Sequence, residues 1–232
     1  MKISSRTHQG LVRLNNEDCV YHDDGEAFAI LADGMGGLLA GEEASQVATF
    51  SSRQSLEADA GCQRALEDIV YDAHTAVAAA AREKNFSGKM GTTLLLWRIN
   101  GGQGEFAHVG DSRLYRYKGG ELTQMSKDMT LAQRMVDEGR VAAHEAHLAP
   151  NQNVLTQAIG LPGNLCPESG TTPVTGRLLL CSDGLSDLVA DEQIAHALAH
   201  DDIEVVAEQL LKDALDRGGR DNISVIVIDL DA

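Results

Sequence analysis

The chain has 232 residues, of which 43% are hydrophobic and 4% aromatic, and its formal net charge at pH 7 is −16. This length suits one large domain or two small ones. Nucleic acids and anionic membranes are bound through a basic surface, so such an acidic composition argues against both as partners.

The cysteines indicate neither a disulfide framework nor a zinc site, because no two of them form a CxxC pair. We interpret them as reduced thiols, which predicts a cytoplasmic protein. The first ten residues contain no apolar stretch of signal-peptide length, and no run of about 18 apolar residues predicts a membrane span.

The first third of the chain predicts short strands followed by two helices. Short apolar runs are typical of strands, whereas apolar residues at helical spacing indicate helices. The strands are expected from Ile3 and over 19–21 and 27–31, with a loop at 10–16, and the helices over 41–59 and 62–84.

Residues 92–123 predict a run of strands joined by glycine turns. The connections are too short for parallel crossovers, so an antiparallel meander is expected. Its strands are predicted over 92–99, 105–109, 113–117 and 121–123.

Residues 126–170 contain few apolar residues and several prolines and glycines, with a short helix expected over 130–138. A long irregular segment inside a compact domain is usually functional, which suggests a lid over a site. A tolerated surface insertion is the alternative interpretation.

The last part of the chain returns to alternating strands and helices. Hairpins outnumber βαβ units along the chain, so the order predicts a layered α+β fold in a single domain over 1–232. Strands are expected at 177–181 and 223–228, and helices at 183–189, 191–199 and 201–216, the last capped by Asp201 or Asp202.

Acidic residues stand at or beside the ends of several predicted strands. Each has a local explanation: Asp33 and Asp111 suit turns, Asp183 suits a helix N-cap, and Asp221 suits the turn before the last strand. If the strands share a sheet, however, their polar ends meet at one rim. The acids taken together therefore predict a common site.

Clustered carboxylates must take up protons or bind cations. Two of them about 4 Å apart repel by about 4 kcal/mol at an effective dielectric constant near 20. Oxygen-rich sites suit Mg²⁺ or Mn²⁺, and the chain has neither zinc-type His/Cys spacing nor the acidic spacing of an EF-hand. The sequence thus predicts a magnesium or manganese site.

The motifs around these acids occur in the order found in a known family. They are Arg13-x-x-Asn16-Glu17-Asp18, Asp33-Gly34-Met35-Gly36-Gly37, Gly91-Thr92-Thr93, Val109-Gly110-Asp111-Ser112-Arg113, Ser182-Asp183-Gly184 and Asp221-Asn222-Ile223. Together they resemble the metal-dependent PPM/PP2C protein phosphatases, and the small size resembles the bacterial serine/threonine branch. The resemblance implies a four-layer α-β-β-α sandwich, with two antiparallel sheets between helix pairs and a flap at about 126–170.

The resemblance also implies roles for the acids. Asp33 would bridge two metal ions, and Asp183 and Asp221 would bind one of them. Asp111 would help Asp183 to hold a weaker third ion. The ligands of the other core ion would be Glu17, Asp18 and the backbone carbonyl of Gly34.

Arg13 would bind the substrate phosphate, because its planar guanidinium matches two phosphate oxygens. A surface arginine paired with a neighbouring acid is the alternative. Two positions depart from many relatives: Met35 and Met129 stand where a histidine is common, and methionine cannot donate a proton.

The implied activity is hydrolysis of phosphoserine and phosphothreonine by a metal-bridged water, in a monomer that opposes a bacterial serine/threonine kinase. Phosphorylated proteins would be the substrates. The alternatives are a phosphoprotein-binding module without activity and a phosphatase of small phosphorylated metabolites. Residues 126–170 would decide the choice of substrate.

Overall fold

A computed structural model of the protein describes residues 1–23, 25, 27–35, 39–59, 61, 63–148 and 151–232. Within these residues the strands form two sheets whose neighbouring strands are all antiparallel. The five-stranded sheet has the order β1 (Lys2–His8), β11 (Ile223–Asp229), β10 (Arg177–Cys181), β7 (Arg113–Lys118) and β8 (Glu121–Gln124). The six-stranded sheet has the order β2 (Asp18–Asp23), β3 (Phe28–Met35), β5 (Leu94–Asn100), β6 (Gln103–Val109) and β9 (Glu168–Thr172), with β4 (Gly91–Thr92) paired to β3.

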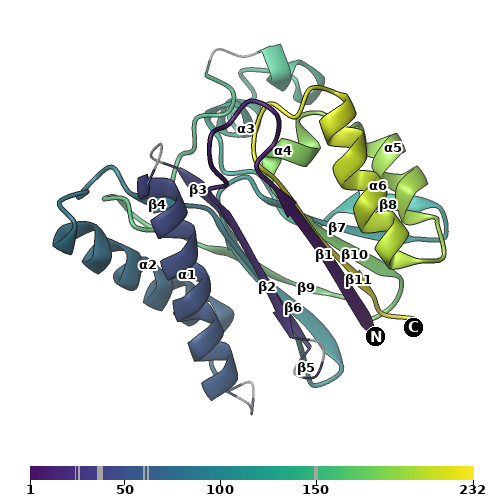
Figure 1. The fold of residues 1–232 in the computed structure, drawn as a ribbon, viewed down its shortest axis with the longest axis horizontal. Coiled ribbons are helices and arrows are strands. Elements are labelled where there is room, and N and C mark those ends of the chain that lie inside the picture. The colour runs from purple at the N-terminus through teal and green to yellow at the C-terminus, as the bar shows by residue number, and fades with distance from the viewer. Residues whose placement is uncertain (24, 26, 36–38, 60, 62, 149–150) are drawn as a thin grey trace.

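Helices cover the outer faces of both sheets, as Figure 1 shows. The six-stranded sheet carries α1 (Leu39–Ala58) and α2 (Leu66–Glu83). The five-stranded sheet carries α4 (Asp183–Ser186), α5 (Asp191–Leu198) and α6 (Ile203–Asp216). The remaining helices are α3 (Leu131–Asp137) and a 3₁₀ turn at Ala143–Leu148. The expected four-layer sandwich is therefore confirmed.

The central strands contain continuous apolar runs because both of their faces are buried. In β3, Ile30 packs toward the helices, whereas Leu31 packs between the sheets. In β11, Val225 and Ile226 divide in the same way between the α6 side and the space between the sheets. Alternate side chains of a strand point to opposite faces, so a strand buried on both sides reads as one apolar run.

Three details of the sequence prediction are wrong. The expected meander is divided between the sheets, since β6 and β7 belong to different ones. The second helix begins at Leu66 rather than near residue 62, which itself lies outside the described residues. The strand expected over 92–99 is interrupted at Thr93, whose backbone N–H turns to the Asp33 carbonyl instead.

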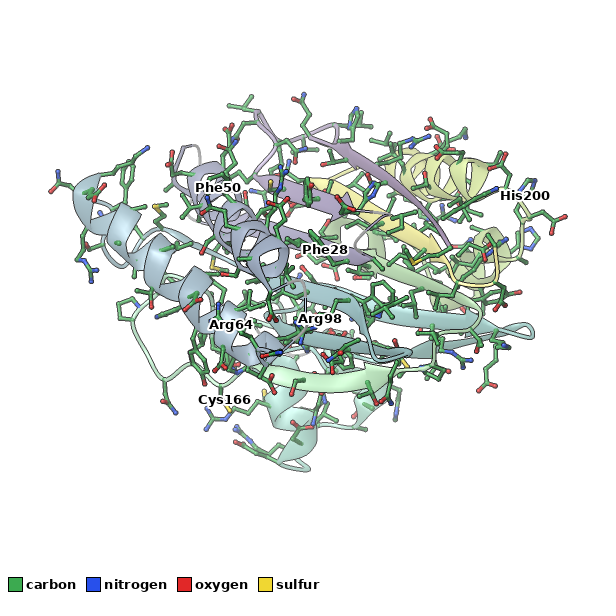
Figure 2. The ribbon with its side chains drawn as sticks, turned by 90° about the horizontal axis from the view of Figure 1, so that it is seen from below. Phe28, Phe50, Arg64, Arg98, Cys166 and His200 are labelled. Carbon is green, nitrogen blue, oxygen red and sulfur yellow. The ribbon has the colours of Figure 1, made fainter. Side chains whose placement is uncertain are left out.

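A buried ion cluster joins the end of α1 to the start of α2. Arg98 donates to Asp59 at 3.1 Å, to Glu105 at 3.0 Å and to the carbonyl of Arg64 at 2.6 Å. Figure 2 shows Arg64 and Arg98 beside one another at this place. Burial of one cation with several acceptors fixes the α1–α2 connection against the sheet.

The segment 126–170 is attached to the rest of the fold at several points. Thr92 and Ile159 form a β-bridge, Met129 N donates to the Gly110 carbonyl at 2.9 Å, and Arg113 donates to Asp128 at 2.7 Å. Its last three residues lie in β9, so the irregular part is shorter than predicted. We call residues 126–167 the flap from here on.

Candidate metal centre

Four of the predicted ligands lie where strands end at one edge of the two sheets. Asp18 begins β2 and stands directly across from Asp33, which lies near the end of β3. Asp183 follows β10 as the first residue of α4, and Asp221 precedes β11, the neighbour of β10. The N-cap of α4 is Ser182, so the alternative interpretation of Asp183 as the cap is wrong.

Asp111 reaches the same place through the crossover between the sheets. The chain leaves β6 at Gly110, whose φ of +113° favours glycine. A Cβ atom at Gly110 would also lie 2.6 Å from a methyl carbon of Thr93, so no other residue fits. This turn carries Asp111 from the six-stranded sheet to the edge where Asp33 and Asp183 lie.

The predicted residues converge on one cavity of about 210 Å³. Its walls include seven of the eight predicted site residues, namely Arg13, Glu17, Asp33, Gly34, Asp111, Asp183 and Asp221. The eighth, Asp18, is buried outside the lining. Its Oδ2 accepts a hydrogen bond from Ser182 Oγ at 3.0 Å, while its buried Oδ1 has no partner.

Burial of these carboxyl groups disfavours their charged forms. Desolvation, followed by repulsion from Asp18 and Asp183, raises the pKa of Asp33 well above its usual value. Desolvation, with repulsion from Asp111 and Asp187, does the same to the pKa of Asp183. Desolvation also raises the pKa of Asp18 to about 6 and that of Asp111 to about 7. The cluster therefore favours either bound protons or a bound cation.

The donor set fits a hard divalent cation. All of the converging side chains other than Arg13 offer oxygen, and the unpartnered Oδ1 of Asp18 is an acceptor that an ion would satisfy. Across the described residues, no group of three or more His, Cys, Asp or Glu side chains is arranged to hold an ion as it stands. The carboxylates would have to rotate toward one another to bind one.

Two glycines make room for the Glu17 side of the cluster. A Cβ atom at Gly34 would lie 2.2 Å from the Gly41 carbonyl oxygen and 2.5 Å from that of Glu17. A Cβ atom at Gly41 would lie 1.8 Å from Glu17 Oε2. Real Cβ atoms do not approach backbone atoms so closely, so only glycine is tolerated at Gly34, whereas a side chain at Gly41 would displace the Glu17 carboxylate from its position. The sequence analysis proposed Gly34 but missed Gly41.

Arg13 lies at the mouth of the cavity with about half of its side chain exposed. Its Nη2 donates to Asp221 Oδ2 at 2.6 Å. In the structure Arg13 is therefore paired with a neighbouring acid, as the alternative interpretation expected. The partner is itself a predicted metal ligand, so the pair places a cation within the proposed site.

The backbone around Asp33 is held by two threonines. Asp33 N donates to Thr93 Oγ1 at 2.9 Å, and Thr92 Oγ1 donates to the Asp33 carbonyl at 2.9 Å. The Thr93 hydroxyl also lies 2.8 Å from Ser112 Oγ, next to Asp111. The motif Gly91-Thr92-Thr93 was recognised in the sequence without a role, and the structure assigns it this one.

Asn222 joins three segments that carry site residues. Its Oδ1 accepts from Glu17 N at 2.8 Å, and its Nδ2 donates to the carbonyls of Gln9 and Asn15 at 2.9 and 2.8 Å. These contacts link the start of β11 to both ends of the loop that carries Arg13. No local sequence signal shows this role, because its partners are more than 200 residues away.

Replacement of Asn222 by alanine should lower the free energy of unfolding by about 3 kcal/mol, because buried polar groups left without partners cost about 1–3 kcal/mol each. Urea denaturation measures this change. Gln209→Ala is the control, since Gln209 makes an exposed contact to Asp213 on the same helix and should cost less than about 0.5 kcal/mol. Equal losses in the two variants would contradict the role of Asn222.

The flap contributes residues that the sequence analysis did not identify. Asn153 and Leu155 line the same cavity as the acids, and Asn153 Nδ2 donates to Asp187 Oδ2 at 2.9 Å. A neighbouring cavity of about 340 Å³ lies between the flap and α4, where His144 faces the region of Asp183. Flap residues lack periodicity, so only their contacts reveal them.

Comparison with known proteins identifies relatives along almost the whole chain. A profile of the protein phosphatase 2C family matches residues 5–217. Serine/threonine protein phosphatase PstP of Mycobacterium tuberculosis is 40% identical over 99% of this chain and 45% of its own length. Protein phosphatase PhpP of Streptococcus pneumoniae is 32% identical over 99% of this chain and 98% of its own length.

A solved structure, the catalytic domain of PstP in complex with two manganese ions, is also similar, with a TM-score of 0.84 and 38% identity. The match covers 98% of this chain and 97% of that one. The chain spans about half the length of the PstP sequence that it matches. Among the helices of the described residues, none is long and apolar enough to cross a membrane. The fold, the order of the acidic motifs and these matches together place the chain in the protein phosphatase 2C family.

Proposed function

We propose that the chain is a Mn²⁺- or Mg²⁺-dependent protein phosphatase that hydrolyses phosphoserine and phosphothreonine in proteins. The observation that carries this proposal is the single cavity of about 210 Å³ that Arg13 shares with buried carboxylates. The family membership supports it, as do the relatives named as serine/threonine phosphatases.

The carboxylates supply the metal ligands in this proposal. Asp33 would bridge two ions, Asp183 and Asp221 would bind one of them, and Asp111 with Asp183 would provide a weaker third site. Glu17, Asp18 and the Gly34 carbonyl serve the second core ion. When bound, such ions lower the pKa of water so that a hydroxide nucleophile is present near neutral pH.

Arg13 has the task of binding and orienting the substrate phosphate. A chain with net charge −16 repels a phosphorylated protein, and Arg13 is the cation among the described residues that line the cavity. Its guanidinium would exchange Asp221 for two phosphate oxygens, which its fork of N–H donors suits. Asp221 would then be free to serve as a metal ligand.

The proton for the departing serine or threonine oxygen must come from a group other than Met35. Met35 lines the cavity, but its thioether carries no proton to donate. Met129 is also without one; its N–H attaches the flap to the Gly110 carbonyl, and its own carbonyl accepts from Thr156 N within the flap. We therefore assign this proton to water.

The domain, its partners and its location follow from the same proposal. Residues 1–232 would act as one domain, because the walls of the cavity come from segments between Arg13 and Asn222, and we propose that this domain acts as a monomer. Its partners would be phosphorylated proteins and the serine/threonine kinase that modifies them. The free thiols of Cys19, Cys166 and Cys181 support a cytoplasmic location.

The proposal is tested by incubating the protein with a phosphothreonine peptide in Mn²⁺, Mg²⁺, Ca²⁺ or EDTA and measuring phosphate release. Release should be rapid with Mn²⁺ or Mg²⁺ and should fall to background in EDTA, because the water nucleophile depends on the ion. Binding of the peptide without turnover, whatever the metal, would instead favour a binding module. Faster release from small phosphorylated metabolites than from any peptide would favour a metabolite phosphatase.

A further inference from the structure

A second hollow adjoins the candidate catalytic cavity on the flap side. It has a volume of about 460 Å³, and Met35, Asn153 and Leu155 line both it and the smaller cavity. Its other walls include Val154, Leu161 and Leu165 from the flap. We call this hollow the flap groove. A chain whose phosphorylated residue lies in the smaller cavity would pass directly into it.

The flap groove differs from the catalytic cavity in charge. None of the described residues that line the flap groove is charged, although 23% of the chain is. The catalytic cavity, in contrast, is lined by Arg13 and several carboxylates. An occupant with a charged side chain would find no partner in the flap groove and would lose hydration there. Its walls also carry polar side chains, but those of Asn153, Thr156 and Gln157 already hydrogen-bond within the protein. Uncharged, apolar side chains therefore suit the groove.

The groove walls are held in position by hydrogen bonds within the flap. Gln157 Oε1 accepts from Cys166 N at 2.7 Å, and Gln157 Nε2 donates to the Cys166 carbonyl at 3.2 Å. Thr156 N donates to the Met129 carbonyl at 2.8 Å, which fixes the adjoining part of the wall. Preformed walls lower the entropy lost on binding, so the groove can select its occupant. The Val154 side chain remains 48% exposed and available for contact.

Exposed apolar residues also flank Arg13 in the loop between β1 and β2, at the mouth of the catalytic cavity. Leu11 and Val12 are each 65% exposed and Leu14 is 86% exposed. Figure 1 shows this loop, between β1 and β2, at the same end of the sheets as the flap. Exposed apolar groups gathered at a site mark surfaces that bind other molecules. The charged cavity is thus bordered by apolar residues on these two sides, whereas the cavity of about 340 Å³ on the α4 side is lined by charged residues such as Asp128 and Asp187.

We propose that the flap groove binds the residues next to the phosphorylated serine or threonine and selects substrates that are uncharged and apolar there. The inference depends on the proposed phosphatase function and specifies which side chains the substrate carries next to its phosphorylated residue. One extended residue spans about 3.4 Å, so side chains one to three positions from the phosphorylated residue can reach the groove. Val154 is the exposed contact that we assign to this selection.

Two phosphothreonine peptides of equal length and net charge test the proposal. One carries leucine and valine at the three positions on each side of the phosphothreonine, and the other carries serine and asparagine there. The kcat/KM of the apolar peptide should exceed that of the polar one by about tenfold or more, because burying one aliphatic side chain is worth that much. Val154→Thr should reduce this ratio by about fourfold, which corresponds to one lost methyl contact.

Val205→Thr is the matched control, since Val205 is 44% exposed on α6, against 48% for Val154. It should leave the ratio at the wild-type value. If the wild-type protein hydrolyses neither peptide, the phosphatase function itself is wrong. Equal hydrolysis of both peptides would overturn the selection while the function stands. An unchanged ratio in Val154→Thr would overturn the assignment to the flap groove.

Discussion

Replacement of Asp33 by asparagine should reduce kcat for a phosphothreonine peptide by a factor on the order of a thousand. Asp33 stands at the centre of the cluster, with Asp18 across the strands and Asp183 nearby, and we propose that it bridges two ions. Removing a preorganised charge from a catalytic centre costs about 10²–10³ in rate, and loss of a bridging ligand should cost at least as much. Initial rates at saturating Mn²⁺ measure the effect.

The same substitution should leave the fold intact and should not destabilise the metal-free protein. The neutral amide cannot carry the buried negative charge that desolvation and repulsion from Asp18 and Asp183 disfavour. Asp201→Asn provides the control, because Asp201 is exposed before α6 and far from the cavity. Turnover by Asp33→Asn within tenfold of the wild type would refute the bridging role. A lowered urea midpoint in EDTA would instead indicate misfolding.

The metal-free protein should be more stable at pH 5 than at pH 8, by roughly 2–4 kcal/mol. The folded-state pKa of Asp18 is about 6 and that of Asp111 about 7, both above the value of about 4 in an unfolded chain. The folded protein therefore binds more protons than the unfolded chain between these values. The resulting stabilisation is complete below about pH 4 and is lost as the pH rises through 6 and 7.

One half-buried histidine, His74, acts in the opposite direction. Desolvation lowers the pKa of His74, whose Nδ1 accepts a hydrogen bond from Gly160 N. A lowered histidine pKa reduces stability as the pH falls, because the unfolded chain then binds the extra proton. The loss from His74 offsets only part of the stability that the carboxyl groups add at pH 5, since the pKa values of Asp33 and Asp183 are also raised.

Mn²⁺ should remove most of this dependence on pH. An ion that binds only the folded protein stabilises it by about 2.7 kcal/mol at a concentration 100 times its Kd, and protons compete with it for the carboxylates. Urea denaturation at pH 5 and pH 8, in EDTA and in MnCl₂, gives the four free energies. Greater stability at pH 8 in EDTA, or the absence of any shift with Mn²⁺, would contradict a buried carboxylate site that takes metal.

The layered fold could be predicted because the strongest patterns are local. The apolar runs of β3 and β11 and the helical spacing in α6 each reflect burial of that element alone. The division of β6 and β7 between two sheets was missed. A short loop permits either a hairpin or a crossover, and the choice at Gly110 depends on packing against Thr93. Such contacts join residues that are distant in the sequence.

The residues of the candidate site also fall into those that local motifs predict and those that only tertiary contacts reveal. The acids and Arg13 were found because each stands in a short motif, whereas Gly41 and Asn153 were not assigned to the site and Asn222 was recognised in a motif without a role. Gly41 leaves the space that Glu17 Oε2 occupies, and the Asn222 side chain hydrogen-bonds to backbone groups of the loop after β1. Nothing beside these residues in the sequence indicates such partners.

The sequence by itself determined which side chains the site contains: the carboxylates, one arginine near them and the order of the strands that carry them. Only the tertiary structure decided that Arg13 pairs with Asp221, that Asp18 is buried with a free oxygen, and that an uncharged groove adjoins the acids. The physical reason is that residue type sets what a group can bind. Burial and distance, which set its pKa and its partners, depend on segments that meet only in the folded chain.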